Sequence, residues 1–299
     1  ATNVEFPKAK NTTAVLPGKS TTPMVRLGAA NAGGLGAIDA VFPILHGPFG
    51  EDGTVQGLLK LANLPFVGAG VLGSAVGMDK DVMKRLLRDA KIPIGKFFAF
   101  SRADKISFAR VRKSLGMPLF VKPANLGSSV GISKVSKPAE FAAAVKDALR
   151  YDNKIIIEEF IPGREIECSV LGNEKPIASL PGEIRYDADW YDYTTKYAEG
   201  LARLIVPAPL DAQLTARVRE LAVAAFRAVD CAGMARVDFF LEGDRPIVNE
   251  INTIPGFTAT SAYARLWEAT GLPYDALIER LLDLAVERHR EKGAGSAPL

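Results

Sequence analysis

Apolar residues recur at helical spacing in several segments of the chain. In residues 79–92, apolar side chains fall at positions 82, 83, 86, 87 and 90, which places them on one face of a helix. A second helix is predicted at residues 103–116. It is expected to end at Gly116, because glycine commonly follows the last helical residue. The same spacing predicts three more helices, at residues 137–151, 210–233 and 274–292.

Short apolar runs between these helices predict strands. They cover residues 40–45, 96–100, 118–123, 154–161 and 234–243, and the segment RPIVNEIN (245–252) is predicted to pair with the last run as a hairpin. From residue 37 onward strands and helices alternate, which indicates an α/β (α+β) protein. Residues 1–36 contain short β-like pieces but no complete βαβ unit. We therefore expect an incomplete N-terminal domain or a numbering that closes over missing residues.

The stretch PIVNEINTIP (246–255) places polar residues inside an otherwise apolar strand. Residues two apart on a strand point to the same face, so Glu250 and Asn252 are expected to lie together. If the hairpin forms, Asp238 of the preceding strand converges with them. Three oxygen donors without a nearby His or Cys suit Mg²⁺ better than zinc. The alternative is a solvated outer face of the hairpin, which the surrounding apolar residues disfavour.

Two further segments contain features of a nucleotide site. Residues 121–135 (VKPANLGSSVGISKV) predict a strand, a Gly/Ser loop and a second strand, in which backbone N–H groups and Lys122 can bind phosphate. An ordinary hairpin is the alternative. In IIIEEFIPGREIE (155–167), carboxylates at a strand end precede a turn and Glu165, so this edge can offer groups to adenine and ribose. A plain charged strand end is the alternative there.

Two glycine motifs do not predict nucleotide sites. The segment PGKSTT (17–22) resembles the end of a P-loop, but that motif requires glycine at the position of Thr13. The segment GAGVLG (68–73) matches GxGxxG, but no strand ending in Asp or Glu follows about 20 residues later. We therefore expect neither a P-loop nor a dinucleotide site.

Composition excludes several classes of protein. Of the 299 residues, 48% are hydrophobic and 24% charged, as in an ordinary globular protein. The net charge of +3 includes no dense basic block, so nucleic acid is not an expected partner. Cys168 and Cys231 form no CxxC motif, which argues against a thiolate zinc site or a disulfide framework and fits a reducing cytosol. No apolar run approaches the roughly 18 residues of a membrane span, so a cytoplasmic protein without a membrane partner is expected.

Seven blocks occur in order between about residues 40 and 275: HGPFGEDGTVQGLL, GMDKDVMKRLL, VKPANLGSSVGISKV, EEFIPGREIE, WYDYTTKY, ARVDFF and NEINTIPGFT. Together they resemble the D-alanine–D-alanine ligases, which belong to the ATP-grasp superfamily. The resemblance implies an ATP-grasp fold of three domains, here with a truncated or partly missing Rossmann-like N-terminal domain. We expect the domains at residues 1–80, 81–165 and 166–299, with a mobile lid at 186–203.

The resemblance also implies a nucleotide site and a metal site. Two lysines and the loop at 127–131 would contact the phosphates. Carboxylate and apolar groups at the end of the predicted strand 154–161 would hold adenine, and Glu165 would hold the ribose. The implied ATP-binding residues are Lys80, Lys122, Ser129, Glu158, Phe160, Ile161, Glu165, Lys196, Phe240 and Asn249. Asp238, Glu250 and Asn252 take the family's positions for two Mg²⁺ ions, which Mn²⁺ can replace.

The implied reaction is the ATP-dependent joining of two D-alanine molecules for peptidoglycan synthesis in the bacterial cytoplasm, by a homodimer. ATP would convert the first D-alanine to an acyl phosphate, and the amine of the second would attack it through a tetrahedral intermediate. The implied catalytic and substrate-binding residues are Arg236, Ser128, Tyr197, Gly256, His46 and Ser261. Arg236 could neutralise the transferring phosphoryl group, and a salt bridge to Glu250 is the alternative for this side chain.

One feature departs from the family pattern. The family has a glutamate in a glycine-rich turn near its N-terminus that anchors the first D-alanine, and AGGLGAID (32–39) does not reproduce it. Two other functions stay open: an ATP-grasp ligase for a different amino acid or hydroxy acid, and a non-catalytic ATP-binding regulatory module. A neutral phenol at Tyr197 favours an amino acid over an anionic hydroxy acid as second substrate.

Overall fold

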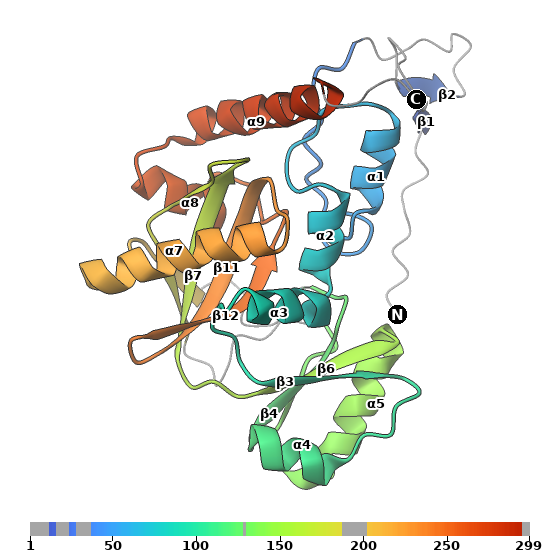
Figure 1. Cartoon of the computed structure of the whole chain (residues 1–299), viewed down its shortest axis with the longest axis vertical. Helices are drawn as coiled ribbons and strands as arrows, with labels where there is room; N and C mark the ends of the chain where they lie inside the picture. The colour runs from blue at the N-terminus through green and yellow to red at the C-terminus, as the bar shows by residue number, and fades with distance from the viewer. Residues whose placement is uncertain (1–11, 16–23, 28–36, 128–129, 187–201, 295–299) are drawn as a thin grey trace.

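A computed structural model describes residues 12–15, 24–27, 37–127, 130–186 and 202–294 (Figure 1). Near the N-terminus, β1 (Thr12–Val15) pairs antiparallel with β2 (Met24–Leu27). Two larger antiparallel sheets follow, and helices α1 (Thr54–Leu61), α2 (Val71–Met78) and α3 (Lys80–Asp89) lie ahead of both in the chain. None of the helices in these ranges is long and apolar enough to cross a membrane.

The predicted strand at residues 40–45 does not form. Val41 makes a single parallel bridge with Phe66, and Pro43 just beyond it has no amide N–H to extend the ladder. Phe42 packs its ring against Phe257 instead, with centroids 4.7 Å apart. An apolar run therefore forms a strand only where a partner strand and a complete set of donors are available.

Helix α3 lies within the predicted segment 79–92 but begins at residue 80. The side chain of Asp79 is the N-cap and accepts hydrogen bonds from the N–H groups of Asp81 and Val82, at 3.1 Å each. Lys91 adopts a positive φ of 60°, which ends the helical path. The helix thus starts with Lys80 held at a fixed point.

The first sheet has four antiparallel strands in the order β3-β6-β4-β5. They are β3 (Phe97–Ser101), β4 (Leu119–Pro123), β5 (Ser133–Val135) and β6 (Lys154–Glu159). Helices α4 (Phe108–Leu115) and α5 (Phe141–Tyr151), the latter preceded by the short 3₁₀ helix η1 (Pro138–Glu140), cover one face. Leu119 and Val121 point into that core, so the alternating residues Phe120 and Lys122 point to the opposite face.

The second sheet has the strand order β10-β9-β7-β11-β12, with β8 paired to β7. Its strands are β7 (Arg164–Gly172), β8 (Ile177–Ala178), β9 (Gly182–Tyr186), β10 (Ala202–Ile205), β11 (Gly233–Glu242) and β12 (Arg245–Asn252). Helix α7 (Ala212–Ala228) packs with α3 on one face, and α8 (Ala262–Ala269) and α9 (Tyr274–Ala294) pack at one end of the other (Figure 1). The helix predicted at 210–233 ends at Ala228, before the predicted end. Asp230 takes a left-handed φ of 56°, and Gly233 already begins β11.

Alternation along β11 determines what remains uncovered. Ala235, Val237 and Phe239 are buried beneath α7, whereas Met234, on the other face, packs against α8 and α9. Arg236, Asp238 and Phe240 share the face of Met234 but lie beyond these two helices, and they are only partly buried. This part of the sheet faces the open side of the four-stranded sheet.

Candidate active site

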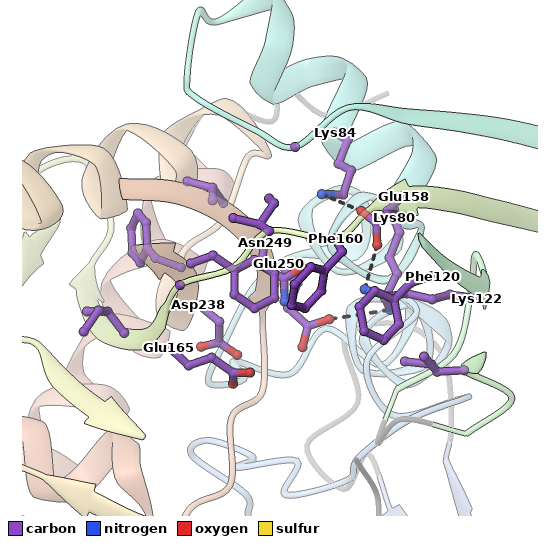
Figure 2. A pocket seen from close by; sticks show the side chains of 18 of the residues that line it. Lys80, Lys84, Phe120, Lys122, Glu158, Phe160, Glu165, Asp238, Asn249 and Glu250 are labelled. Atoms are coloured by element: carbon purple, nitrogen blue, oxygen red, sulfur yellow. Dashed lines mark ion pairs between the residues drawn. The ribbon is translucent and has the colours of Figure 1, made fainter. Parts of the chain in front are cut away.

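A cavity lies between the two sheets and is lined by both (Figure 2). The four-stranded sheet and α3 contribute one side, and strands β7, β11 and β12 contribute the other. Most of the predicted ATP-site and metal-site residues meet here, although they are up to 170 positions apart in sequence. Those that line the cavity are Lys80, Lys122, Glu158, Phe160, Ile161, Glu165, Asp238, Phe240, Asn249 and Glu250, and the predicted catalytic residue Arg236 lines it with them.

On the first side, two lysines share one buried carboxylate. Lys122 Nζ lies 2.6 Å from Glu158 Oε2, and Lys84 Nζ of α3 lies 2.8 Å from Glu158 Oε1. Burial acts to raise the pKa of Glu158, but the charges of Lys122 and Lys84 outweigh it and lower the pKa well below the ordinary range. Burial likewise opposes the charge of Lys122, and Glu158 outweighs it, so the pKa of Lys122 is raised.

Lys84 was missed by the sequence analysis. It is only 2% exposed, although it lies on a helix whose apolar spacing had been attributed to packing alone. A lysine three residues before the core residue Leu87 was the available signal, because lysines are rarely buried without a partner. Glu167, Phe120 and Tyr186 also line the cavity without having been predicted to do so.

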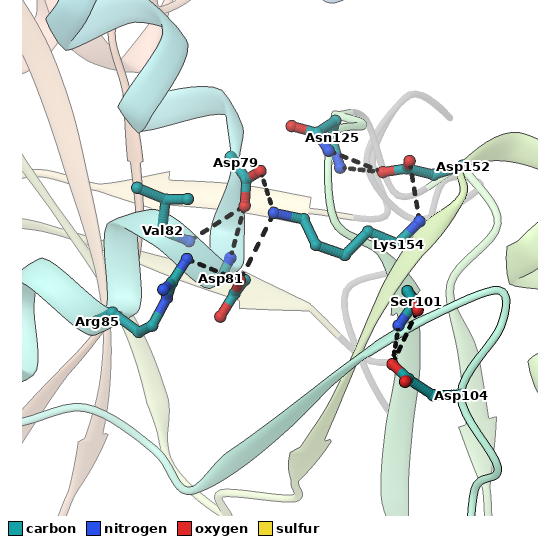
Figure 3. Close-up of polar contacts among 9 residues, drawn as sticks. All are labelled: Asp79, Asp81, Val82, Arg85, Ser101, Asp104, Asn125, Asp152 and Lys154. Carbon is teal, nitrogen blue, oxygen red and sulfur yellow. Dashed lines mark hydrogen bonds and ion pairs between the residues drawn. The ribbon is translucent and has the colours of Figure 1, made fainter.

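Contacts around the start of α3 position Lys80, and Figure 3 shows those that Asp79 and Asp81 make with Lys154. Lys154 of β6 forms ion pairs with Asp79 and, at 3.5 Å, with Asp81. The Lys80 backbone N–H donates to the Ala124 carbonyl at 3.0 Å, and Lys80 Nζ donates to the Leu126 carbonyl at 2.6 Å. These contacts join α3 to the segment that leaves β4 toward the Gly/Ser loop.

The same segment is anchored on its other side. The backbone N–H and the side-chain amide of Asn125 both donate to Asp152 Oδ2, at 2.8 and 2.9 Å (Figure 3). Residues 124–126 are therefore held between α3 and Asp152, the residue that caps the end of α5 just before β6. Ser128 and Ser129, predicted to act in this loop, lie outside the described residues.

On the second side, the predicted hairpin forms. Asp238 pairs directly with Glu250, and Arg236 pairs with Asn252, so their side chains share one face of the sheet. A β-bulge between Asp238 and Phe239 shifts the register, and Asn249 is the extra residue of β12. The bulge brings Asn249 to the cavity beside Glu250, which strict alternation would not do.

Arg236 is held by carboxylates on its own face. It forms a bidentate pair with Asp238, with both N···O distances 2.7 Å, and lies 3.4 Å from Glu167 of β7. Burial acts to lower the pKa of Arg236, but Asp238 and Glu167 outweigh it and raise the pKa above its usual value. Asn252 Nδ2 donates to Asp238 Oδ2 at 2.9 Å, which completes this polar cluster.

Carboxylates outnumber cations on this side, and Glu165 shows the consequence. Burial, together with the charges of Asp238 and Glu250, raises the pKa of Glu165 to about 7, although the Tyr186 hydroxyl donates to it at 2.7 Å. A bound cation would relieve this repulsion. In the described part of the chain no group of three or more His, Cys, Asp and Glu side chains is arranged to hold a metal. Two carboxylates and an amide nevertheless fit Mg²⁺, which typically binds one or two protein carboxylates together with substrate phosphates.

The aromatic residues form an apolar part of the cavity at the end of β6. The rings of Phe120 and Phe160 lie 6.2 Å apart between centroids, and Lys134 Nζ lies 5.3 Å from the centroid of Phe160. The turn from β6 into β7 passes close to β11, because a Cβ at Gly163 would lie 2.6 Å from the Leu241 carbonyl oxygen. Phe160 and Ile161 follow the last ladder residue of β6, so the predicted strand 154–161 ends at residue 159.

His46, Gly256 and Ser261 are brought together around one loop that follows β12. His46 Nδ1 lies 3.1 Å from the Ile254 carbonyl oxygen. Glu51, whose pKa is raised by burial, accepts from the Gly47 N–H at 2.6 Å and lies close enough to His46 for their charges to interact. Ser261 is the N-cap residue of α8, and its Oγ lies 3.5 Å from a Cβ built on Gly256.

Other predicted residues lie outside the described ranges. They are Lys196, Tyr197 and most of the predicted lid 186–203. The described ends of that lid segment are strands: Tyr186 ends β9 and pairs with Ala202 of β10. The segment AGGLGAID (32–39) stands where the family has the glutamate that anchors the first D-alanine. Most of this segment falls among residues 28–36, which are also outside the described ranges.

Two antiparallel sheets on either side of a cavity, one bearing lysines and the other carboxylates, define an ATP-grasp protein, and the solved structures to which this chain is similar have that architecture. The family model "D-ala D-ala ligase C-terminus" matches residues 86–283, and "D-ala D-ala ligase N-terminus" matches residues 5–69. The chain belongs to the D-alanine–D-alanine ligase family.

Individual relatives cover most of the chain. A D-alanine–D-alanine ligase of Oceanobacillus iheyensis is 47% identical over 96% of this chain and 79% of its own length. D-alanine–D-alanine ligase A of Escherichia coli K12 is 52% identical over 94% of this chain and 78% of its own. Among solved structures, the ligase of Coxiella burnetii superposes with a TM-score of 0.84 at 42% identity, covering 95% of this chain and 76% of that one. The VanG D-Ala:D-Ser ligase of Enterococcus faecalis gives 0.83 at 36% identity, covering 92% and 79%.

Proposed function

We propose that this protein uses ATP to join two D-alanine molecules into D-alanyl-D-alanine, a precursor for peptidoglycan. The main structural support is the hairpin of β11 and β12. Its residues Arg236, Asp238 and Glu250 share one face and lie across the cavity from Lys80 and Lys122. Relatives of 47% and 52% identity bear the name of this activity, which supports the same chemistry here.

ATP would occupy the cavity between the sheets. Lys80 and Lys122 would contact its phosphates, with Ser129 and Lys196 assigned to the same task by the family pattern. Glu158, Phe160 and Ile161 would hold the base, with Phe240 packing on it, and Glu165 with Asn249 would bind on the ribose side. A structure of the Bacillus anthracis ligase complexed with ATP gives a TM-score of 0.75 at 30% identity, covering 86% of this chain and 82% of that one, which supports this assignment.

Asp238, Glu250 and Asn252 would hold Mg²⁺, or Mn²⁺ in its place. When bound, two such ions would neutralise the phosphate charges and orient the terminal phosphoryl group. The gathering of Glu165, Asp238 and Glu250 in one cavity, with Asp238 paired directly to Glu250, supports a cation at this position.

The residues of the chain would then act in two steps. In the first, a carboxylate oxygen of one D-alanine forms a bond to the terminal phosphorus of ATP as the bond to ADP breaks, giving an acyl phosphate. In the second, the amine of the other D-alanine attacks the acyl carbon and loses a proton, and inorganic phosphate leaves. Arg236 would neutralise the phosphoryl group, and Arg236 with the Gly256 N–H would stabilise the tetrahedral oxyanion.

The second substrate would lie near the loop after β12. Ser261, at the N-terminus of α8, would receive its carboxylate, and His46 would lie beside it, held by the Ile254 carbonyl. Ser128 and Tyr197 would hydrogen-bond to close the site. A neutral Tyr197 favours the zwitterionic amino acid, so a dipeptide rather than an ester is the expected product.

Three broader assignments accompany this proposal. We propose domains at residues 1–80, 81–165 and 166–299, a homodimer as the working assembly, and the bacterial cytoplasm as the location. Sedimentation of the purified protein tests the assembly, and a monomer at micromolar concentration would contradict it.

A competition assay tests the reaction. The enzyme is incubated with D-alanine, D-serine and D-lactate at equal concentration and with ATP at neutral pH. The products are separated by chromatography and identified by mass spectrometry. D-Alanyl-D-alanine is expected to predominate. D-Alanyl-D-serine as the main product would place the protein with ligases such as the Enterococcus faecalis neighbour, D-alanyl-D-lactate would overturn the role of Tyr197, and ADP release independent of D-alanine would contradict the ligase.

A further inference from the structure

Among the described residues that line the cavity, Lys84 is the only lysine to which the mechanism above gives no task. Its side chain lies between α3 and β6 and reaches Glu158 Oε1 at 2.8 Å, while Lys122 occupies Oε2 on the other side of the carboxylate (Figure 2). The side chain of Lys84 is 3% exposed, so it is screened from solvent and committed to this contact. A buried charge in such a place needs a reason beyond solubility.

We propose that Lys84 is a positioning residue that fixes Glu158 as an acceptor-only group for the 6-amino group of adenine, so that the site selects ATP over GTP. This inference rests on the proposed function, in which the cavity binds ATP with Glu158 at the base. It assigns to Lys84 a role in choosing the nucleotide rather than in the transfer of the phosphoryl group.

Counting hydrogen-bond sites shows that Glu158 can still bind a base. An ionised carboxylate offers about four acceptor sites, and the two lysines use one on each oxygen. The remaining sites can only accept. Adenine presents an amino group at position 6, which donates, whereas guanine presents a carbonyl oxygen there, which also accepts. A permanently ionised Glu158 therefore attracts the first base and repels the second.

Lys122 alone could not maintain this state during turnover. Lys122 also faces the phosphates, and any displacement toward them weakens its hold on Glu158. A buried carboxylate left without a cation takes up a proton or turns away, and a protonated Glu158 could donate to the guanine oxygen. Lys84 keeps one cation on Glu158 whatever Lys122 does.

The backbone of Lys84 is suited to this role because it cannot easily move. The neighbouring residues Met83 and Leu87 are fully buried in the core beneath the six-stranded sheet. Asp79 caps the start of the helix and pairs with Lys154. Glu158 is equally fixed, because it pairs with Phe97 on one side and Phe120 on the other as part of a central strand.

The test compares nucleotide preference in Lys84→Met, Lys84→Arg and Glu158→Gln. Calorimetry gives the affinities for ADP and GDP without D-alanine, and ligation assays give kcat/KM for ATP and GTP. Lys84→Met is expected to lower the adenine preference about tenfold, because the site loses discrimination made by one buried polar pair. Lys84→Arg keeps a cation on Glu158 and should retain most of the preference. Lys113→Met, an exposed lysine change on α4, should leave it unchanged.

A double variant shows whether Lys84 acts through Glu158. Glu158→Gln can donate as well as accept, so it should lose the preference by itself, and adding Lys84→Met should cause no further loss. An unchanged ADP-to-GDP ratio in Lys84→Met, including an equal loss of affinity for both nucleotides, would overturn the inference. Thermal unfolding of each variant shows whether it is folded. If Lys84→Met proves to be misfolded, Lys84→Gln replaces it in the same measurements.

The outcome is separable from the proposed reaction. If the wild-type protein binds ADP more tightly than GDP but makes no dipeptide, the proposed function is wrong. The role of Lys84 is then still tested by the ratio of ADP to GDP affinity in the Lys84 variants. If the wild-type protein makes the dipeptide equally well with ATP and GTP, the reaction stands and the role of Lys84 is overturned.

Discussion

The two sides of the cavity balance their charges in different ways. On the side of α3 and the four-stranded sheet, Lys84 and Lys122 are both within 2.8 Å of Glu158, and Lys80 lies 3.7 Å from Glu250 across the gap. On the side of the six-stranded sheet, the described lining residues include four carboxylates, Glu165, Glu167, Asp238 and Glu250, and one cation, Arg236. We call these the lysine side and the carboxylate side.

This difference in charge balance indicates which kind of ligand each side can bind. The lysine side has an excess of cations that are held in place by ion pairs and hydrogen bonds, which suits phosphate. The carboxylate side has an excess of acceptors, and burial together with the charges of Asp238 and Glu250 raises the pKa of Glu165 to about 7. A ligand that joins a polyanion to a divalent cation satisfies both sides at once, and ATP with Mg²⁺ is such a ligand.

The strongest way to break the comparison is to neutralise the carboxylate side. Asp238→Asn and Glu250→Gln should each lower the rate of D-alanine-dependent ADP release by at least about 100-fold, because a site with two carboxylates loses charge and geometry together. The fold should persist, as judged by circular dichroism. Glu242→Gln, an exposed change at the end of β11, is the matched control. Near-normal turnover at ordinary magnesium concentration in either variant would show that these residues do not form a metal site.

The lysine side should respond through nucleotide affinity. Lys122→Met is expected to lower kcat/KM for ATP by roughly 10- to 100-fold, since it removes one cation from the developing charge on the phosphates. It also leaves Glu158 with Lys84 as its remaining lysine partner. Steady-state kinetics with ATP as the varied substrate measure the effect, with Lys113→Met as control. If only the KM for D-alanine changed, Lys122 would belong to the amino acid site instead.

Titration of Glu165 sharpens the comparison on the carboxylate side. Its folded pKa of about 7 exceeds the ordinary value of 4.5, so the folded protein retains a proton that the unfolded chain releases in this range. This contribution to the free energy of unfolding is complete below pH 4.5 and is lost as the pH rises through 7. The free energy of unfolding of Glu165→Gln, relative to that of the wild type, should therefore rise by about 3 kcal/mol from low to high pH.

Denaturant unfolding at a series of pH values, with a chelator and without nucleotide, measures this difference. Glu220→Gln, an exposed change on α7, should show no such trend. A constant difference between Glu165→Gln and the wild type across the range would mean that the pKa of Glu165 is not raised in the folded protein.

The smallest effect is expected where the lysine side is anchored. Asp79→Asn keeps an N-cap for α3 but removes the ion pair with Lys154, which should lower the free energy of unfolding by about 1 kcal/mol. The KM for ATP should rise only a few-fold, since Lys80 keeps its bonds to residues 124 and 126. Lys154→Met should reproduce the loss, and the double variant should add little to it. Additive losses would show that the two residues do not act as a pair.

Much of the carboxylate side could be predicted from sequence, because it depends on local periodicity. Alternation along residues 246–255 placed Glu250 and Asn252 on one face, and the hairpin with Asp238 pairs in the register this requires. The lysine–loop–strand segment at 121–135 likewise forms β4 and β5 as an antiparallel pair. In both cases the residues that must meet are close in sequence, so the rule of two residues per repeat is sufficient.

Other features were decided only by the tertiary structure. The bulge that brings Asn249 to the cavity, the shared carboxylate of Lys84 and Lys122, and the crowding that raises the pKa of Glu165 have no periodic signal. Each depends on the approach of elements far apart in sequence: α3 on β6, or β7 beside β11. The run at 40–45 failed as a strand for the same reason, because its partner was a single residue, Phe66. Local pattern determines which face a side chain takes, whereas only the packing of whole sheets and helices determines what that face meets.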